Sequence, residues 1–153
     1  MYNRKKIKKY GGNMVEISYK NFNLQQICDS GQCFRMNRTQ ENTYQLIAQE
    51  RLLKMEQKEE SIVFFCSEKE WEEVWRDYFD LDTDYEAIIK TIDHKDDYLQ
   101  RAAKYGSGIR ILHQDLWEMI ISFIISQQNN IKRIRKCIQT ICERFGEKKT
   151  AED

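Results

Sequence analysis

Proline is absent from this 153-residue sequence, and glycine occurs only 6 times. The chain therefore contains no proline-rich or glycine-rich low-complexity linker, and we find no internal repeat. Long apolar runs are also absent: the longest, near Ile120, is far too short to span a bilayer, and no apolar segment follows the basic N-terminus as a signal peptide requires. These absences predict a cytoplasmic protein with no membrane partner.

Patterns that bind metals are absent as well. The 2 histidines are isolated, and the 5 cysteines form no Cys-x-x-Cys pair and have no histidine at ligand spacing. Most cysteines lie in apolar patterns, so we expect reduced, buried thiols and neither a metal nor a cofactor. Several aspartates stand at helix starts or in loops without the spacing of a metal site, which favours helix capping. They are Asp29, Asp80, Asp82, Asp84, Asp96 and Asp97.

Charge is balanced overall but placed unevenly. Residues 1–13 carry 5 basic and no acidic side chains, residues 129–149 carry 7 basic and 2 acidic, and residues 14–128 carry 13 basic and 21 acidic. This asymmetry fits a protein that contacts DNA with one rim, and it also fits charged helices that are merely solvated. With 41% hydrophobic residues, the chain can form a globular core of one domain or one and a half.

The first half of the sequence predicts an antiparallel meander. Short extended runs alternate with polar breaks, and a short helix near Leu24 to Cys28 interrupts them before Gly31. Residues 1–13 are predicted to be a flexible basic arm. The expected strands are Met14–Ser18, Phe34–Met36, Thr43–Ala48, Leu52–Gln57 and Ile62–Cys66.

Helices are predicted from residue 67 onward, which makes the fold class α+β. Ser67 and Glu70 form a capping box, and Gly146 is a natural helix stop. The expected later helices are 84–91, 96–105, 115–126 and 130–145. Tryptophans that lie in apolar helical patterns are expected in the core: Trp71, Trp75 and Trp117. The inner stripe of the last helix is predicted to be Ile131, Ile134, Ile138, Ile141 and Phe145.

The segment from Ile120 to Ile134 changes from apolar to carboxamide-rich to basic within a few residues. A helix that is apolar on nearly every side should be buried, so it would hold Gln127 to Asn130 on a rigid support at its end. Carboxamides pair with base edges and phosphates, and cations suit phosphate. Asn130 is also a good N-cap, and both roles can hold together. The basic residues that follow are Lys132, Arg133, Arg135 and Lys136.

Four spaced motifs resemble the 8-oxoguanine DNA glycosylase family, in the same order and at similar spacings over roughly residues 14–146. They are Phe22-Asn23-Leu24 leading to Asp29-Ser30-Gly31-Gln32-Cys33-Phe34-Arg35, Tyr78-Phe79-Asp80-Leu81-Asp82, Gly108-Ile109-Arg110-Ile111-Leu112, and Ser126 to Ile131. The resemblance implies an N-terminal α+β domain over residues 14–110, with a twisted sheet like that of the TATA-binding protein. It implies the truncated start of a helical helix-hairpin-helix domain over residues 111–153.

The same resemblance implies roles for single residues. The glycine that matches Gly31 offers its carbonyl to the flipped base and selects 8-oxoguanine, which has a hydrogen on N7 where guanine has a lone pair. A plain turn that needs glycine for its backbone angles is the alternative. The position of Gln128 is usually an asparagine that enters the space left by the everted nucleotide. Asn129 and Asn130 match residues that contact the DNA backbone. Arg133 matches an arginine that reads the estranged cytosine in some members, and a phosphate contact or a solvated side chain is the alternative.

The catalytic lysine and aspartate of the family have no match in this sequence. The first hypothesis is therefore an N-terminal fragment of a DNA-repair glycosylase and AP lyase that recognises oxidised guanine in duplex DNA, is associated with a bacterial nucleoid, and is inactive alone. The alternative is a non-catalytic DNA-binding or protein-interaction module from a truncated gene. Its uncovered sheet would favour dimerisation, and a complementing C-terminal fragment is the other expected protein partner.

Overall fold

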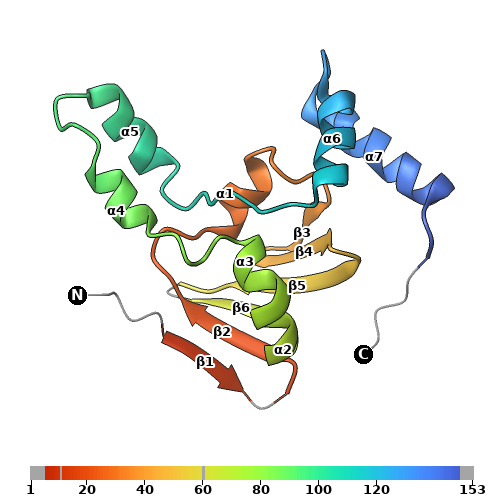
Figure 1. Ribbon diagram of the computed structural model, residues 1–153, viewed down its shortest axis with the longest axis horizontal. Coiled ribbons are helices and arrows are strands. Elements are labelled where there is room, and N and C mark those ends of the chain that lie inside the picture. Colours follow the sequence, from red (N-terminus) through yellow and green to blue (C-terminus); the bar gives the residue numbers. More distant parts are fainter. Residues whose placement is uncertain (1–5, 11, 60, 149–153) are drawn as a thin grey trace.

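The computed structural model describes residues 6–10, 12–59 and 61–148 (Figure 1). Six antiparallel strands form one sheet in the order β1-β2-β6-β5-β4-β3. The four strands from β3 to β6 pair in chain order, as the predicted meander requires. Strand β2, which was predicted as the first strand of the meander, pairs instead with the last, β6. The bounds are β1 Lys6–Tyr10, β2 Met14–Ser18, β3 Met36–Gln40, β4 Thr43–Ala48, β5 Arg51–Gln57 and β6 Ile62–Phe65.

Strands β1 and β3 differ most from the sequence prediction, while β5 begins and β6 ends one residue earlier than predicted. Residues 6–10 form β1, with Lys6 opposite Ser18 and Tyr10 opposite Met14, where a flexible arm is predicted. The free edge of β2 offers them backbone partners, and basic composition does not reveal such pairing. Strand β3 runs from Met36 to Gln40, so it shares only Met36 with the predicted strand Phe34–Met36, because residues 34 and 35 belong to a turn. The rest of the predicted arm includes residues 1–5 and 11, which lie outside the described residues.

Alternating side chains of the sheet form the core together with the helices that cross it. Met55 of β5 and Phe64 of β6 are opposite each other and fully buried. The ring of Phe64 meets that of Trp71 at a centroid distance of 4.7 Å. Trp75 is also fully buried, and its ring nitrogen donates a hydrogen bond to Glu70 over 2.8 Å. The core positions predicted for these two tryptophans are confirmed.

The helices lie close to their predicted positions, because their caps are local. Ser67 Oγ accepts a hydrogen bond from the Glu70 amide at 3.1 Å, which confirms the capping interaction. The Asp84, Asp96 and Asp115 side chains likewise cap α4, α5 and α6. The bounds are α1 Leu24–Asp29, α2 Glu68–Glu70, the π-helical turn η1 Trp71–Trp75, α3 Arg76–Tyr78, α4 Tyr85–Lys90, α5 Asp97–Tyr105, α6 Leu116–Ser126 and α7 Ile131–Phe145.

Helix α6 is not buried, which corrects the sequence prediction. None of its residues is buried within the described chain, and Trp117 is 70% exposed. The predicted inner stripe of α7 is buried only at Ile134 and Ile138. The apolar composition of α6 predicts that the helix packs against other residues. It does not show that those residues lie within the described part of the chain. No helix in those residues is long and apolar enough to cross a membrane.

The five thiols separate into two classes. The prediction of buried cysteines is confirmed for three and wrong for Cys137 and Cys142, which are exposed on α7. Burial raises the pKa of the Cys66 thiol to about 12 and also raises the pKa values of Cys28 and Cys33. Because the thiolate is the reactive form, we expect a disulfide reagent at about pH 8 to label only the two exposed thiols in the native protein. Mass spectrometry checks the count, full labelling in urea is the control, and rapid native labelling of Cys66 would contradict the prediction.

Candidate DNA interface

The turn between α6 and α7 contains the predicted carboxamides and is held by two of them. Asn129 Nδ2 donates to the Ile125 carbonyl at 3.0 Å. Asn130 Oδ1 accepts from the Arg133 amide at 3.1 Å, so Asn130 is the N-cap of α7 as predicted. The turn is therefore rigid at both ends, and these carboxamides are committed to internal bonds.

Gln128 is the carboxamide that remains available. Its side chain is exposed and forms no hydrogen bond with any described residue. Its backbone has a φ of 50°, in the left-handed region that costs a residue with a side chain about 1–2 kcal/mol. A local strain of this kind is maintained only by the surrounding contacts, which here are the bonds of Asn129 and Asn130. The turn thus fixes the backbone of Gln128 and leaves its side chain exposed.

Basic side chains surround the same turn. Lys132, Arg133 and Lys136 are exposed on the first half of α7, and the first turn of that helix has no acidic residue. The positive end of the helix dipole adds to their charge. The structure therefore brings three of the four predicted phosphate-binding residues together with Gln128 at one end of α7. The fourth, Arg135, is partly buried and donates to the Cys28 carbonyl, so the prediction is wrong for that residue.

The Gly31 loop lies against the start of α7. Gly31 has a φ of 78°, which explains the need for glycine in this turn. An ideal Cβ at Gly31 would lie 3.9 Å from Ile131 Cδ1, and Arg135 Nη2 donates to the Cys28 carbonyl at 3.0 Å. The carbonyl of Gly31 accepts no hydrogen bond from any residue that the structure describes. A free carbonyl and the carboxamide turn, which are about 100 residues apart in the sequence, thus share one region of the fold.

Gln32 fixes this loop to the segment that leads into α6, a role that sequence reasoning did not assign. Its Nε2 donates to the Arg110 carbonyl at 2.9 Å, and its Oε1 accepts from the Leu112 amide at 3.1 Å. Gln114 Nε2 in turn donates to the Gln32 carbonyl at 2.8 Å. The sequence offered one signal for this role, because Gln32 stands next to Gly31 in the first of the four motifs. The Gln32 side chain bonds to two backbone groups of the segment 110–112, as a neighbouring strand would. It therefore fixes the Gly31 loop relative to the segment that leads into α6.

Arg110 is the second residue whose role was missed. Its side chain is fully buried, and its Nε donates to the Phe79 carbonyl at 2.9 Å. Its Nη2 donates to the carbonyls of Asp80 and Thr83, and its guanidinium lies 4.0 Å from the ring centre of Tyr85. The two central sequence motifs therefore form one structural junction, with Arg110 as its centre.

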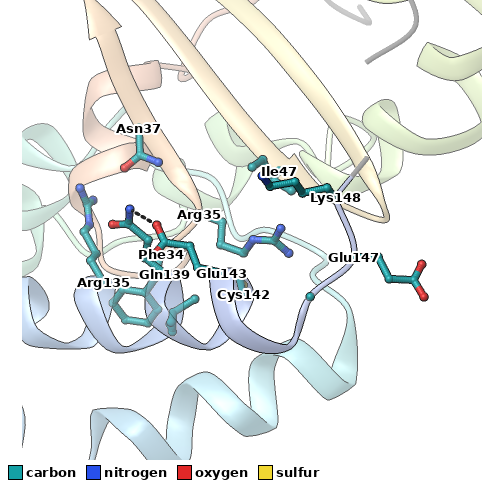
Figure 2. Close-up of a pocket in the computed structure, with 12 residues that line it drawn as sticks. Phe34, Arg35, Asn37, Ile47, Arg135, Gln139, Cys142, Glu143, Glu147 and Lys148 are labelled. Carbon is teal, nitrogen blue, oxygen red and sulfur yellow. Dashed lines mark hydrogen bonds between the residues drawn. The ribbon is translucent and has the colours of Figure 1, made fainter. Parts of the chain in front are cut away.

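A pocket of about 570 Å³ lies beside the second half of α7, between that helix and strands β3 and β4 (Figure 2). Its lining carries both signs of charge. Arg35 Nη1 lies 3.9 Å from Glu118 Oε1, and Gln139 Nε2 donates a hydrogen bond to Glu143 Oε1 at 2.8 Å. Neither Gly31 nor the carboxamide turn lines this pocket. Within the described ranges, no group of three or more His, Cys, Asp or Glu side chains is placed to hold a metal ion.

Comparison with known proteins identifies the family of this site. The model of the 8-oxoguanine DNA glycosylase N-terminal domain matches residues 14–120, which is more than half of the chain. The chain belongs to the 8-oxoguanine DNA glycosylase family. This glycosylase-family chain is also 54% identical over 39 residues to an N-glycosylase/DNA lyase of Saccharomyces cerevisiae, a match that covers 26% of this chain and 10% of the yeast protein.

Solved structures of the family superpose on almost the whole chain. The 8-oxoguanine glycosylase/lyase of Clostridium acetobutylicum without DNA has a TM-score of 0.86 and 38% identity over 99% of this chain. The same bacterial protein bound to duplex DNA has a TM-score of 0.85, and MBOgg1 with a low-affinity DNA ligand has a TM-score of 0.87 with 35% identity over 94% of this chain. The match covers 50–52% of those proteins, so this glycosylase-family chain spans about half of their length.

Proposed function

We propose that this chain is the lesion-recognition half of an 8-oxoguanine DNA glycosylase/lyase that acts in base excision repair beside the bacterial nucleoid. The contact between the Gly31 loop and the start of α7 carries the proposal, because it places a free carbonyl near a free carboxamide and three exposed cations. The Clostridium acetobutylicum relative, which is 37% identical, binds duplex DNA with cytosine opposite 8-oxoguanine.

Each part of this surface has a distinct role in the proposed complex. Lys132 and the positive end of α7 neutralise phosphates. Gln128 enters the gap left by the everted nucleotide, which offsets part of the few kcal/mol needed for unstacking and unpairing. Arg133 faces the estranged cytosine, while Asn129 and Asn130 hold the turn and contact the DNA backbone with their remaining donors.

Lesion selection in this proposal belongs to Gly31. A backbone carbonyl accepts a hydrogen bond from N7–H of 8-oxoguanine and repels the N7 lone pair of guanine, a difference of about 1–3 kcal/mol. Cleavage of the sugar bond needs an amine nucleophile and a carboxylate, for which the family pattern has no match in residues 1–153. We therefore propose that the chain recognises the lesion and does not excise it alone.

Binding to a fluorescent duplex tests this function. We expect about 10-fold tighter binding when 8-oxoguanine replaces guanine opposite cytosine, because the selecting hydrogen bond is worth about 1.4 kcal/mol or more. Changing both Gln128→Ala and Arg133→Ala should remove most of that preference, measured by fluorescence anisotropy at fixed salt. The matched control is Gln25→Ala with Arg101→Ala, which alters exposed residues of the same types on α1 and α5.

Two results would reject lesion recognition. Equal affinity for both duplexes with steep salt dependence would favour a non-catalytic DNA-binding module. Absence of binding to either duplex by the folded chain would favour a protein-interaction module instead.

A further inference from the structure

The pocket between the second half of α7 and strands β3 and β4 contains hydrogen-bond donors that the described residues leave unused (Figure 2). The Arg35 guanidinium donates no hydrogen bond to any described residue, and its Nη1 lies 3.9 Å from the Glu118 carboxylate, beyond hydrogen-bond distance. The exposed side chains of Asn37 and Lys148 likewise form no hydrogen bond within the described chain. We call Arg35, Asn37 and Lys148 the donor set of the pocket. Two of its three members are cations, which have donors and no acceptor.

The carboxylates of the same lining are less available to a ligand. Glu143 Oε1 already accepts a hydrogen bond from Gln139 Nε2 at 2.8 Å. Figure 2 shows Glu147 directed away from the other lining side chains. Arg135 adds another cation, and its Nε is buried without an acceptor among the described residues. The polar part of the pocket therefore favours an anion, because charged donors form their strongest hydrogen bonds with anionic oxygens.

Apolar side chains form the rest of the lining. They are Phe34, Ile47 and Ile138, of which Ile138 is only 7% exposed and Ile47 is 39% exposed. The volume of about 570 Å³ lies within the range of about 300–1,000 Å³ that is usual for small-molecule sites. An apolar surface beside a few polar groups is also the usual composition of such sites. The pocket thus suits a molecule with an apolar body and one charged group.

We propose that this pocket binds a small organic anion, whose aromatic or aliphatic body packs against Phe34, Ile47 and Ile138 and whose carboxylate or phosphate group contacts the donor set. The planar guanidinium of Arg35 pairs with two oxygens of that group, since its parallel N–H donors match their spacing. This site goes beyond the proposed function, because neither Gly31 nor the carboxamide turn lines it.

Three probes with the same ring system test the charge requirement. 2-Naphthoate has a carboxylate, 2-naphthyl phosphate has a phosphate, and 2-naphthamide is the neutral control. In calorimetric titration of the whole chain, we expect at least one anion to bind about 10-fold or more tighter than the amide, through charge-assisted hydrogen bonds. The tighter of the two anions identifies the site as one for carboxylates or for phosphate esters.

Substitution of Arg35 tests the residue that holds the charge. Arg35→Ala should weaken binding of the tighter anion by about 10-fold or more and leave binding of the amide unchanged. Arg35→Lys should be intermediate, because lysine keeps the charge without the planar pair of donors. The matched control is Arg38→Ala, since Arg38 is exposed on β3 and does not line the pocket. Thermal unfolding first establishes that each variant is folded.

Two thiols of α7 locate the bound probe without any substitution. Cys142 lines the pocket and Cys137 does not, and both are exposed. A saturating concentration of the tighter anion should slow alkylation of Cys142 by neutral iodoacetamide and leave Cys137 unchanged. The proposal is overturned if neither anion binds, if the amide binds as tightly, if Arg35→Ala binds like the unchanged chain, or if Cys142 is not selectively protected. Because no DNA is present, these outcomes are separate from those for lesion recognition.

Discussion

Arg110→Ala is expected to lower the free energy of unfolding by about 3–5 kcal/mol, the largest effect that we expect from one substitution. Alanine would leave the buried carbonyl of Phe79 and the partly buried carbonyls of Asp80 and Thr83 without this donor. It would also leave a cavity beside the ring of Tyr85. Because a domain of this size is stable by only about 5–15 kcal/mol, much of the folded population would be lost in mild denaturant.

Urea unfolding followed by tryptophan fluorescence measures this loss. Arg110→Lys keeps the charge but cannot supply the same planar set of donors, so it should fall between alanine and the unchanged chain. Arg101→Ala is the matched control, because Arg101 is exposed on α5. An unfolding curve for Arg110→Ala that coincides with that of Arg101→Ala would show that the buried junction does not hold the domain together.

Gly108→Ala is expected to cost about 2–4 kcal/mol, because the added methyl group has no space. An ideal Cβ would lie 2.3 Å from Asn23 Cβ and 2.8 Å from Gln26 Oε1. Relief of this clash must disturb two bonds: the Asn23 amide donates to the Gly108 carbonyl at 2.9 Å, and the Gly108 amide donates to Gln26 Oε1 at 2.7 Å. Since Asn23 caps α1, the damage would extend to the helix before the Gly31 loop.

Gly106→Ala offers a close comparison for Gly108. Its Cβ would meet the flexible end of Ile109 at 3.4 Å, so we expect a change of less than about 1 kcal/mol in the same urea experiment. If the two alanine variants were equally stable, the close approach of residue 108 to α1 would not be a constraint on the fold. A larger loss at residue 108 would explain the glycine of the third sequence motif by packing alone.

Both substitutions act on the segment that connects the two parts of the interface. Arg110 and Gly108 hold residues 105–112 against α1 and the loop after α3, and Gln32 joins the same segment to the Gly31 loop. The exposed side chains that we propose to bind DNA therefore depend on residues of this junction for their position. A destabilised junction should weaken lesion preference together with stability, whereas Gln128→Ala should affect binding alone.

Local signals in the sequence were sufficient for most of the elements. Ser67, Asp84, Asp96 and Asn130 cap helices as predicted, because a cap is formed by residues three positions apart. Strand β4 was predicted with its exact bounds, since its alternating pattern reflects one buried face. Strand β1 was not predicted, because its partner is a sheet edge that only the folded chain presents.

The sequence by itself determined the family motifs, the glycine at residue 31 and the carboxamide turn, because each depends on a few adjacent residues. Tertiary structure alone decided that Gly31 lies beside α7, that Arg110 and Gln32 connect distant motifs, and that α6 turns its apolar side outward. The physical reason is that capping and turn geometry are local properties of the chain. Burial instead depends on which surfaces meet, and the composition of a helix does not specify its neighbour.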